Sequence, residues 1–117
     1  MIAMIFEFRV DQETPGVREE YQRASAELRG LLQGVAGLHS VERFESTIDP
    51  GKYVTIAYFE SEEAVAAWRN RPEHRKAQAL GRSRFFLDYR LVMAKVVRDY
   101  GPHDRTQTPA DSRAVHG

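Results

Sequence analysis

The sequence predicts an α+β fold whose elements follow the order β-α-β-β-α-β. Two observations carry this prediction. Side chains follow a period of two in several segments, as strands require, and apolar residues recur every three or four positions after residues 16 and 61, as helices require. Turn-forming residues stand between these segments, as at Gly37 and Asp49–Gly51. The remaining residues fix where each element begins and ends.

The first half of the chain predicts a strand, a helix and a hairpin. Residues 2–10 form the strand, one face of which carries Ile2, Met4, Phe6, Phe8 and Val10. Thr14 and Pro15 suit the cap and first position of a helix that extends to about Gly34 or Gly37. Residues 39–46 and 52–59 flank a turn sequence, so they predict a β-hairpin.

The second half predicts two helical segments and a last strand. Ser61 suits an N-cap, and the helix that follows runs to about Asn70. Pro72 restarts a helix that runs to about Arg84, because proline is tolerated in a first turn but not in a helix interior. Residues 88–100 alternate as a strand. Residues 101–117 are polar and aperiodic, which predicts a flexible C-terminal tail after a domain of residues 1–100.

This order is the ferredoxin-like arrangement, an antiparallel sheet with helices on one face. The strands nevertheless carry apolar side chains on their other face as well. These residues are Ile5, Val54, Ile56, Tyr58, Val92, Ala94 and Val96. Because an exposed apolar surface of this extent usually marks an association site, we expect a homodimer that pairs through the sheet face.

The composition narrows the possible partners and chemistry. Seventeen basic and seventeen acidic side chains give no net charge, which disfavours binding to nucleic acid or to an anionic membrane. The chain has no cysteine, so thiolate chemistry is excluded and a cytoplasmic location is expected. Its four histidines lack the spacing of metal ligands, and we therefore expect no metal site.

Several stretches resemble one known family, the antibiotic biosynthesis monooxygenase (ABM) domain. They are Asp49–Tyr53, Glu63–Asn70, Pro72–Arg75, Asp88–Arg90 and Val96–Tyr100. The resemblance spans nearly all of residues 1–100 and implies a dimeric α+β barrel. It further implies, for members similar to the cofactor-free monooxygenases, that an aromatic substrate of the anthrone or quinol type reacts directly with O2. No cofactor is then expected.

His74 is the candidate catalytic residue. It shares a helical face with Ala77, Gln78 and Gly81, and the small residues leave space beside it. A histidine at a cavity can accept a proton from a phenol or an anthrone near neutral pH. The alternative is a histidine that only packs or caps a helix start after Pro72.

The candidate substrate-binding residues are Trp68, Gln78, Tyr53, Tyr89 and Phe8. Each has a structural alternative: the tryptophan can fill the core, and a buried tyrosine usually satisfies its own hydroxyl. Arg43 and Arg90 are weaker candidates for orienting an anionic ligand, because charges on strands more often face solvent or pair with acids.

Heme degradation is disfavoured. The heme-degrading relatives carry an asparagine where this chain has Phe8, and a histidine ligand where it has Gln78, ten residues after Trp68. Two functions stay open: a cofactor-independent monooxygenase, or a non-catalytic small-molecule-binding or accessory dimer of the same fold.

Overall fold

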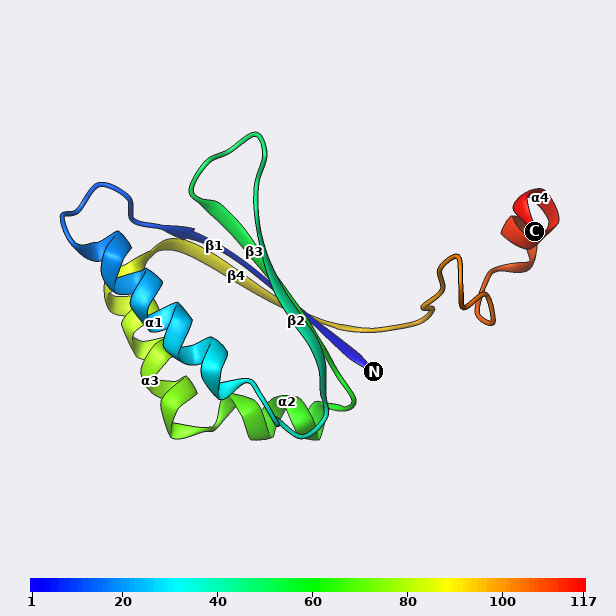
Figure 1. Ribbon diagram of the computed structural model, residues 1–117, viewed down its shortest axis with the longest axis horizontal. Helices are drawn as coiled ribbons and strands as arrows, with labels where there is room; N and C mark the ends of the chain where they lie inside the picture. Colours follow the sequence, from blue (N-terminus) through cyan, green and yellow to red (C-terminus); the bar gives the residue numbers. More distant parts are fainter.

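Four antiparallel strands form the centre of the computed structural model, which describes residues 1–117. The strand order across the sheet is β2-β3-β1-β4, and each neighbouring pair is antiparallel. The strands are β1 Ile2–Val10, β2 Leu38–Glu45, β3 Lys52–Phe59 and β4 Phe86–Lys95. Helices lie on one side of this sheet (Figure 1). The predicted ferredoxin-like architecture is therefore confirmed.

The helices within residues 1–100 follow the predicted order. They are α1 Val17–Leu31, α2 Glu62–Arg69, α3 Pro72–Leu80, the π-helical turn η1 Gly81–Phe85 and α4 Ala110–His116. Ser61 caps α2, since its Oγ accepts the backbone N–H of Ala64 at 3.2 Å. The second helical segment reaches the expected length, but its last turn widens from α to π before the chain enters β4.

The start of α1 differs from the prediction. Thr14 does not cap the helix through its side chain; instead Gly16, with φ of 82°, occupies the cap position. The preceding turn is held by Asp11, whose Oδ1 accepts the backbone N–H groups of Glu13 and Thr14. A left-handed backbone at Gly16 costs little because glycine has no Cβ.

The core between helices and sheet consists of two separate clusters. One contains Phe8, Val10, Val17, Tyr21 and Phe85, and the other contains Ala57, Phe59, Val65 and Trp68. Partly buried side chains lie around both, and 13 of the 117 residues are buried. A domain usually builds one contiguous core, whereas the fully buried residues here fall into two groups, each with partly buried hydrophobic side chains packed against it.

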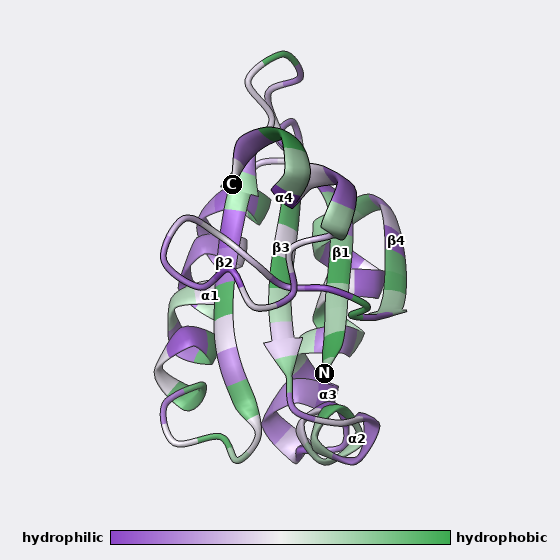
Figure 2. Cartoon of the chain, turned by 90° about the vertical axis from the view of Figure 1, so that its right-hand side faces the viewer, coloured by the Kyte–Doolittle hydropathy of each residue, from purple (hydrophilic) through white to green (hydrophobic).

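The opposite face of the sheet has no helix against it. The strand register places Ile5 of β1 between Ile56 of β3 and Val92 of β4 on this face. Hydrophobic stretches follow the central strands β1 and β3 (Figure 2). The expected homodimer through this face stays a prediction.

The end of the chain extends away from the sheet (Figure 1). Strand β4 ends at Lys95, earlier than the predicted Tyr100, and α4 was not anticipated from the sequence. The segment is held by its own contacts: Asp99 N–H donates to Gln107 Oε1 at 2.6 Å, and Arg113 donates to the carbonyl of Arg105 at 2.6 Å. None of the helices is sufficiently long and apolar for a membrane span.

Candidate functional site

The predicted pair Trp68 and His74 meets at the corner between α2 and α3. Helix α2 ends at Arg69, and Arg71 adopts an extended conformation that redirects the chain before Pro72 opens α3. The last turn of one helix therefore lies against the first turn of the next. The two ring centroids are 4.5 Å apart with planes inclined by 39°. Trp68 is 4% exposed, so its indole fills the core as well as touching His74.

The imidazole of His74 has an unusual environment. Its Nδ1 atom is buried and has no hydrogen-bond partner. Burial, together with a smaller contribution from the nearby positive charge of Arg75, lowers the pKa of His74 from 6.5 to about 4. The sequence led us to expect a group that titrates near neutral pH. The structure instead places a neutral imidazole here at pH 7, with an unused ring nitrogen.

Gln78 lies one turn beyond His74 and has its polar groups occupied. Its Oε1 accepts a hydrogen bond from Arg75 at 2.9 Å, and its Nε2 donates to the carbonyl of Arg69 at 3.3 Å. Arg75 also donates to Asn70 Oδ1 at 2.5 Å. These contacts tie α3 to the end of α2, so Gln78 stabilises the corner that holds Trp68 against His74.

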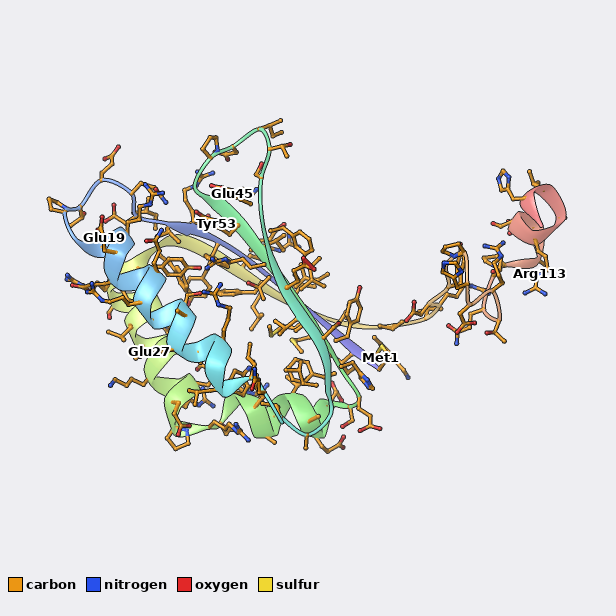
Figure 3. The ribbon with its side chains drawn as sticks, in the orientation of Figure 1. Met1, Glu19, Glu27, Glu45, Tyr53 and Arg113 are labelled. Carbon is orange, nitrogen blue, oxygen red and sulfur yellow. The ribbon has the colours of Figure 1, made fainter.

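The other three predicted residues form a second group, a row of aromatic rings across the sheet. The strand register aligns Tyr53, Phe8 and Tyr89 across β3, β1 and β4. Phe8 stacks on Tyr53 with centroids 5.6 Å apart, and Phe6 connects Phe8 to Tyr89 at 4.9 and 6.2 Å. Side chains occupy the space between the sheet and α1, near the labelled Tyr53 (Figure 3).

We call these four residues, Phe6, Phe8, Tyr53 and Tyr89, the aromatic row. Phe8 is 4% exposed, whereas Tyr89 is 45% exposed at the β4 edge. The row thus runs from a buried centre to an open edge. None of its ring contacts includes Trp68 or His74, so the structure places the predicted site residues in two groups rather than one.

Arg43 and Tyr21 form a contact that the sequence did not predict. Arg43 Nη1 donates to Tyr21 Oη at 2.5 Å and to Ser25 Oγ at 3.0 Å, which joins β2 to α1. The guanidinium also lies 5.4 Å from the ring centroids of both Tyr21 and Tyr53. Burial raises the pKa of Tyr21, so its phenol stays protonated. The sequence held one indication of this contact. Arg43 stands two residues after the partly buried Val41, so both side chains lie on the same face of β2.

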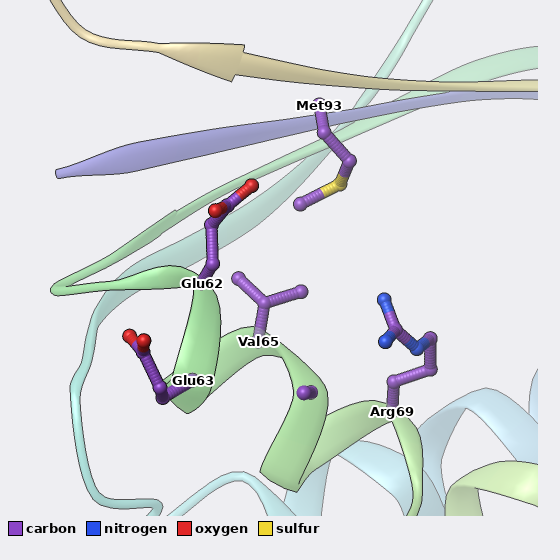
Figure 4. A pocket seen from close by; sticks show the side chains of 6 residues that line it. Glu62, Glu63, Val65, Arg69 and Met93 are labelled. Atoms are coloured by element: carbon purple, nitrogen blue, oxygen red, sulfur yellow. The ribbon is translucent and has the colours of Figure 1, made fainter.

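Among the open hollows of the surface, two lie beside α2 and the β2–β3 hairpin. One of about 320 Å³ lies between α2 and β4, and the other of about 200 Å³ lies beside the β2–β3 hairpin. The first is lined by Glu62, Glu63, Val65, Ala66, Arg69 and Met93. In Figure 4 the Met93 side chain of β4 points toward Val65 of α2. Val65 also belongs to the core cluster of Trp68, so this hollow opens beside the Trp68 corner.

No group of three histidine or carboxylate side chains comes together in a way that could hold a metal ion.

Comparison with known sequences then identifies the family. The sequence profile described as antibiotic biosynthesis monooxygenase matches residues 1–80. The chain belongs to this family. The resemblance noted from its Trp68-to-His74 segment is thereby confirmed.

Two curated relatives match the same length of chain. A jasmonate monooxygenase of Pyricularia oryzae is 29% identical over 96 residues, which cover 82% of this chain but 43% of that protein. The uncharacterized protein YqjZ of Bacillus subtilis is 30% identical over 96 residues, which cover 82% of this chain and 79% of that protein. The chain therefore spans less than half of the named monooxygenase.

Solved structures share the fold. Rv0793 from Mycobacterium tuberculosis superposes with a TM-score of 0.73 at 17% identity, covering 86% of this chain and 98% of that one. SnoaB, a cofactor-independent oxygenase from Streptomyces nogalater, superposes with a TM-score of 0.69 at 13% identity, covering 84% and 94%. At these identities the likeness establishes the architecture and leaves the reaction to the site residues.

Proposed function

We propose that this chain is a cofactor-independent monooxygenase that oxidises a small aromatic substrate of the anthrone or quinol type with O2. The buried, unpartnered Nδ1 of His74 beside Trp68 carries the proposal. Buried polar atoms nearly always have a hydrogen-bond partner, so an orphan nitrogen suits a group that a ligand supplies. Membership of the family, and the monooxygenase among its relatives, support this class of reaction.

In this proposal the substrate binds between the helices and the sheet. Trp68 stacks on one side of the aromatic substrate, and Phe8, Tyr53 and Tyr89 offer ring faces and hydroxyls from the sheet. Gln78 borders the site and keeps α3 in place through its bonds to Arg75 and Arg69.

His74 acts as the base. At pH 7 its imidazole is neutral and available, although its lowered pKa makes it a weak base when the site is empty. The carbanion formed on the substrate is a negative charge beside the ring, and this charge stabilises the imidazolium. Proton transfer is therefore coupled to substrate binding rather than to bulk pH.

The reaction balances without another reductant. An anthrone CH2 group loses a proton to His74, and the resulting carbanion transfers electrons to O2 and forms a C–O bond. The O–O bond then breaks, one oxygen atom stays as the ketone, and the other leaves as water with the two hydrogens of the CH2 group. The substrate supplies all four electrons that reduce O2.

The test is oxygen uptake with a panel of anthrones and hydroquinones. We expect wild type to consume one O2 per ketone formed and His74→Ala to lose turnover while keeping its circular dichroism spectrum. His39→Ala, an exposed histidine on β2, is the matched control and should retain activity. Unchanged uptake in His74→Ala would remove His74 from the mechanism, and no uptake by wild type would exclude the proposed reaction for the panel.

A non-catalytic small-molecule-binding dimer is the second candidate. One observation favours it: neither described hollow is lined by Trp68 or His74. A binder of this kind would be stabilised thermally by aromatic ligands without consuming O2. The oxygen-uptake assay therefore separates the two functions.

We further propose that the working form is a cytoplasmic homodimer paired through the helix-free sheet face. The apolar row of Ile5, Ile56 and Val92 supports this, because a twofold sheet-on-sheet contact would bury it. Ile56→Glu is expected to shift the mass measured by light scattering from dimer to monomer. The control is Ile48→Glu, since Ile48 is 92% exposed in the hairpin turn. A monomeric wild type, or a dimeric Ile56→Glu, would contradict this arrangement.

A further inference from the structure

We infer that Arg43 is a recognition site for a carboxylate on the aromatic substrate. This inference rests on the proposed function and names the chemical class of its substrate, an aromatic acid.

The guanidinium is held in place by neutral groups. Its Nη1 donates to the Tyr21 hydroxyl at 2.5 Å and to Ser25 Oγ at 3.0 Å. The rings of Tyr21 and Tyr53 lie at equal distances of 5.4 Å from its central carbon. Because two neighbouring elements and two rings define its position, the group is pre-organised before any ligand arrives. An arginine that merely covers the surface would not need these contacts.

No carboxylate of the protein neutralises this charge. The ion pairs of the chain are Arg9 with Asp49 and Arg84 with Glu20, and neither involves Arg43. Both hydrogen bonds of Arg43 come from one nitrogen, so the donors on Nη2 and Nε have no protein acceptor. A planar guanidinium with two free donor positions matches the two oxygens of a carboxylate.

The acids nearest in sequence are directed elsewhere. Glu45 Oε2 accepts the backbone N–H of Gly51 at 3.2 Å and so stabilises the hairpin turn. Glu42 pairs in register with Ile56, on the face of the sheet opposite the helices. The positive charge of Arg43 is therefore left for a ligand on the helix-facing side.

The aromatic row begins beside this charge. Tyr53 contacts the guanidinium and also stacks on Phe8, with centroids 5.6 Å apart. A flat substrate that lies over the row would thus find a cation at the β2 end and the open β4 edge at the other. An acidic substituent at one end of the substrate would fix its orientation along the aromatic row.

The experiment compares two probes that differ only in charge, anthraquinone-2-carboxylate and its primary carboxamide, by calorimetry at pH 7. Wild type is expected to bind the carboxylate about ten-fold more tightly than the carboxamide, the low end for a charge-assisted hydrogen bond at a partly exposed site. Arg43→Gln should bind the two probes equally, and Arg43→Lys should recover part of the preference. Arg90→Gln, a change on the opposite sheet face, should keep the full ratio.

The variants also distinguish a recognition role of Arg43 from a purely structural role in which it only links β2 to α1. If the role were only structural, Arg43→Gln would lower the melting temperature and weaken the binding of both probes together, and that result would overturn the inference. Equal binding of both probes to wild type would overturn it too, while leaving the proposed monooxygenase intact. Conversely, His74→Ala should keep the probe ratio. If that variant also keeps turnover, the proposed base fails and the Arg43 site stands.

Discussion

Acid should destabilise this protein in part through His74. His74 is neutral in the folded state because burial lowers its pKa from 6.5 to about 4. An unfolded chain leaves the same ring in water, where it binds a proton below about pH 6.5. Between these two values the unfolded state holds more protons than the folded state. The free energy of unfolding therefore falls as the pH is lowered from about 6.5 to about 4.

The size of this effect follows from the pKa difference. A fully buried ring with this displacement would lose about 3 kcal/mol of stability across the interval. The ring of His74 keeps some contact with solvent, so screening reduces the expected loss to about 1–2 kcal/mol. The loss is complete only below about pH 4, and stability above pH 7 is unaffected by this group.

His74→Gln provides the comparison, because glutamine is similar in size and does not titrate. Urea unfolding of both proteins at pH 7.0, 5.5 and 4.5, at one protein concentration, isolates the histidine from the carboxylates common to both chains. We expect wild type to lose about 1–2 kcal/mol more than the variant between pH 7.0 and 4.5. A constant difference between the two proteins at all three pH values would refute the assigned pKa.

Further predictions concern two glycines in or next to helices and the cap of α2. Gly81→Ala should lower the free energy of unfolding by about 1–3 kcal/mol, because a Cβ there would lie 2.4 Å from the Phe86 ring. Gly30→Ala in α1 meets nothing within 4 Å and should raise the free energy of unfolding by about 0.5–1 kcal/mol. Denaturant titration distinguishes the two signs, and equal effects of both substitutions would contradict the packing. Ser61→Ala should lower the free energy of unfolding by about 1 kcal/mol, because it removes the acceptor of the Ala64 N–H. An unchanged melting temperature would show that the cap contributes nothing to stability.

The fold could be read from the sequence because its signals are local. The parity of β1 alone placed Phe8 and Val10 on the helix-facing side, and both lie in the core there. Proline at the start of α3 and serine before α2 marked the two helix starts correctly. The π turn at Gly81–Phe85 has no comparable sequence signal, since it depends on how the helix end packs against β4.

The site was less predictable because it depends on contacts between distant segments. The sequence nominated both Trp68 and His74, but only the sharp turn at Arg71 brings their rings to 4.5 Å. The contact of Arg43 with Tyr21 joins residues 22 positions apart and needs α1 to lie over β2. The depressed pKa of His74 likewise follows from burial, which no spacing rule reveals.

The contact between Trp68 and His74 has a practical consequence. Trp68 is the single tryptophan of the chain, so all indole emission originates at this corner. A protonated imidazole in contact with an excited indole accepts an electron and quenches its light, whereas a neutral one does so weakly. The steady-state fluorescence of the unlabelled protein therefore reports the charge on His74 during a titration or during turnover, and no added dye is needed.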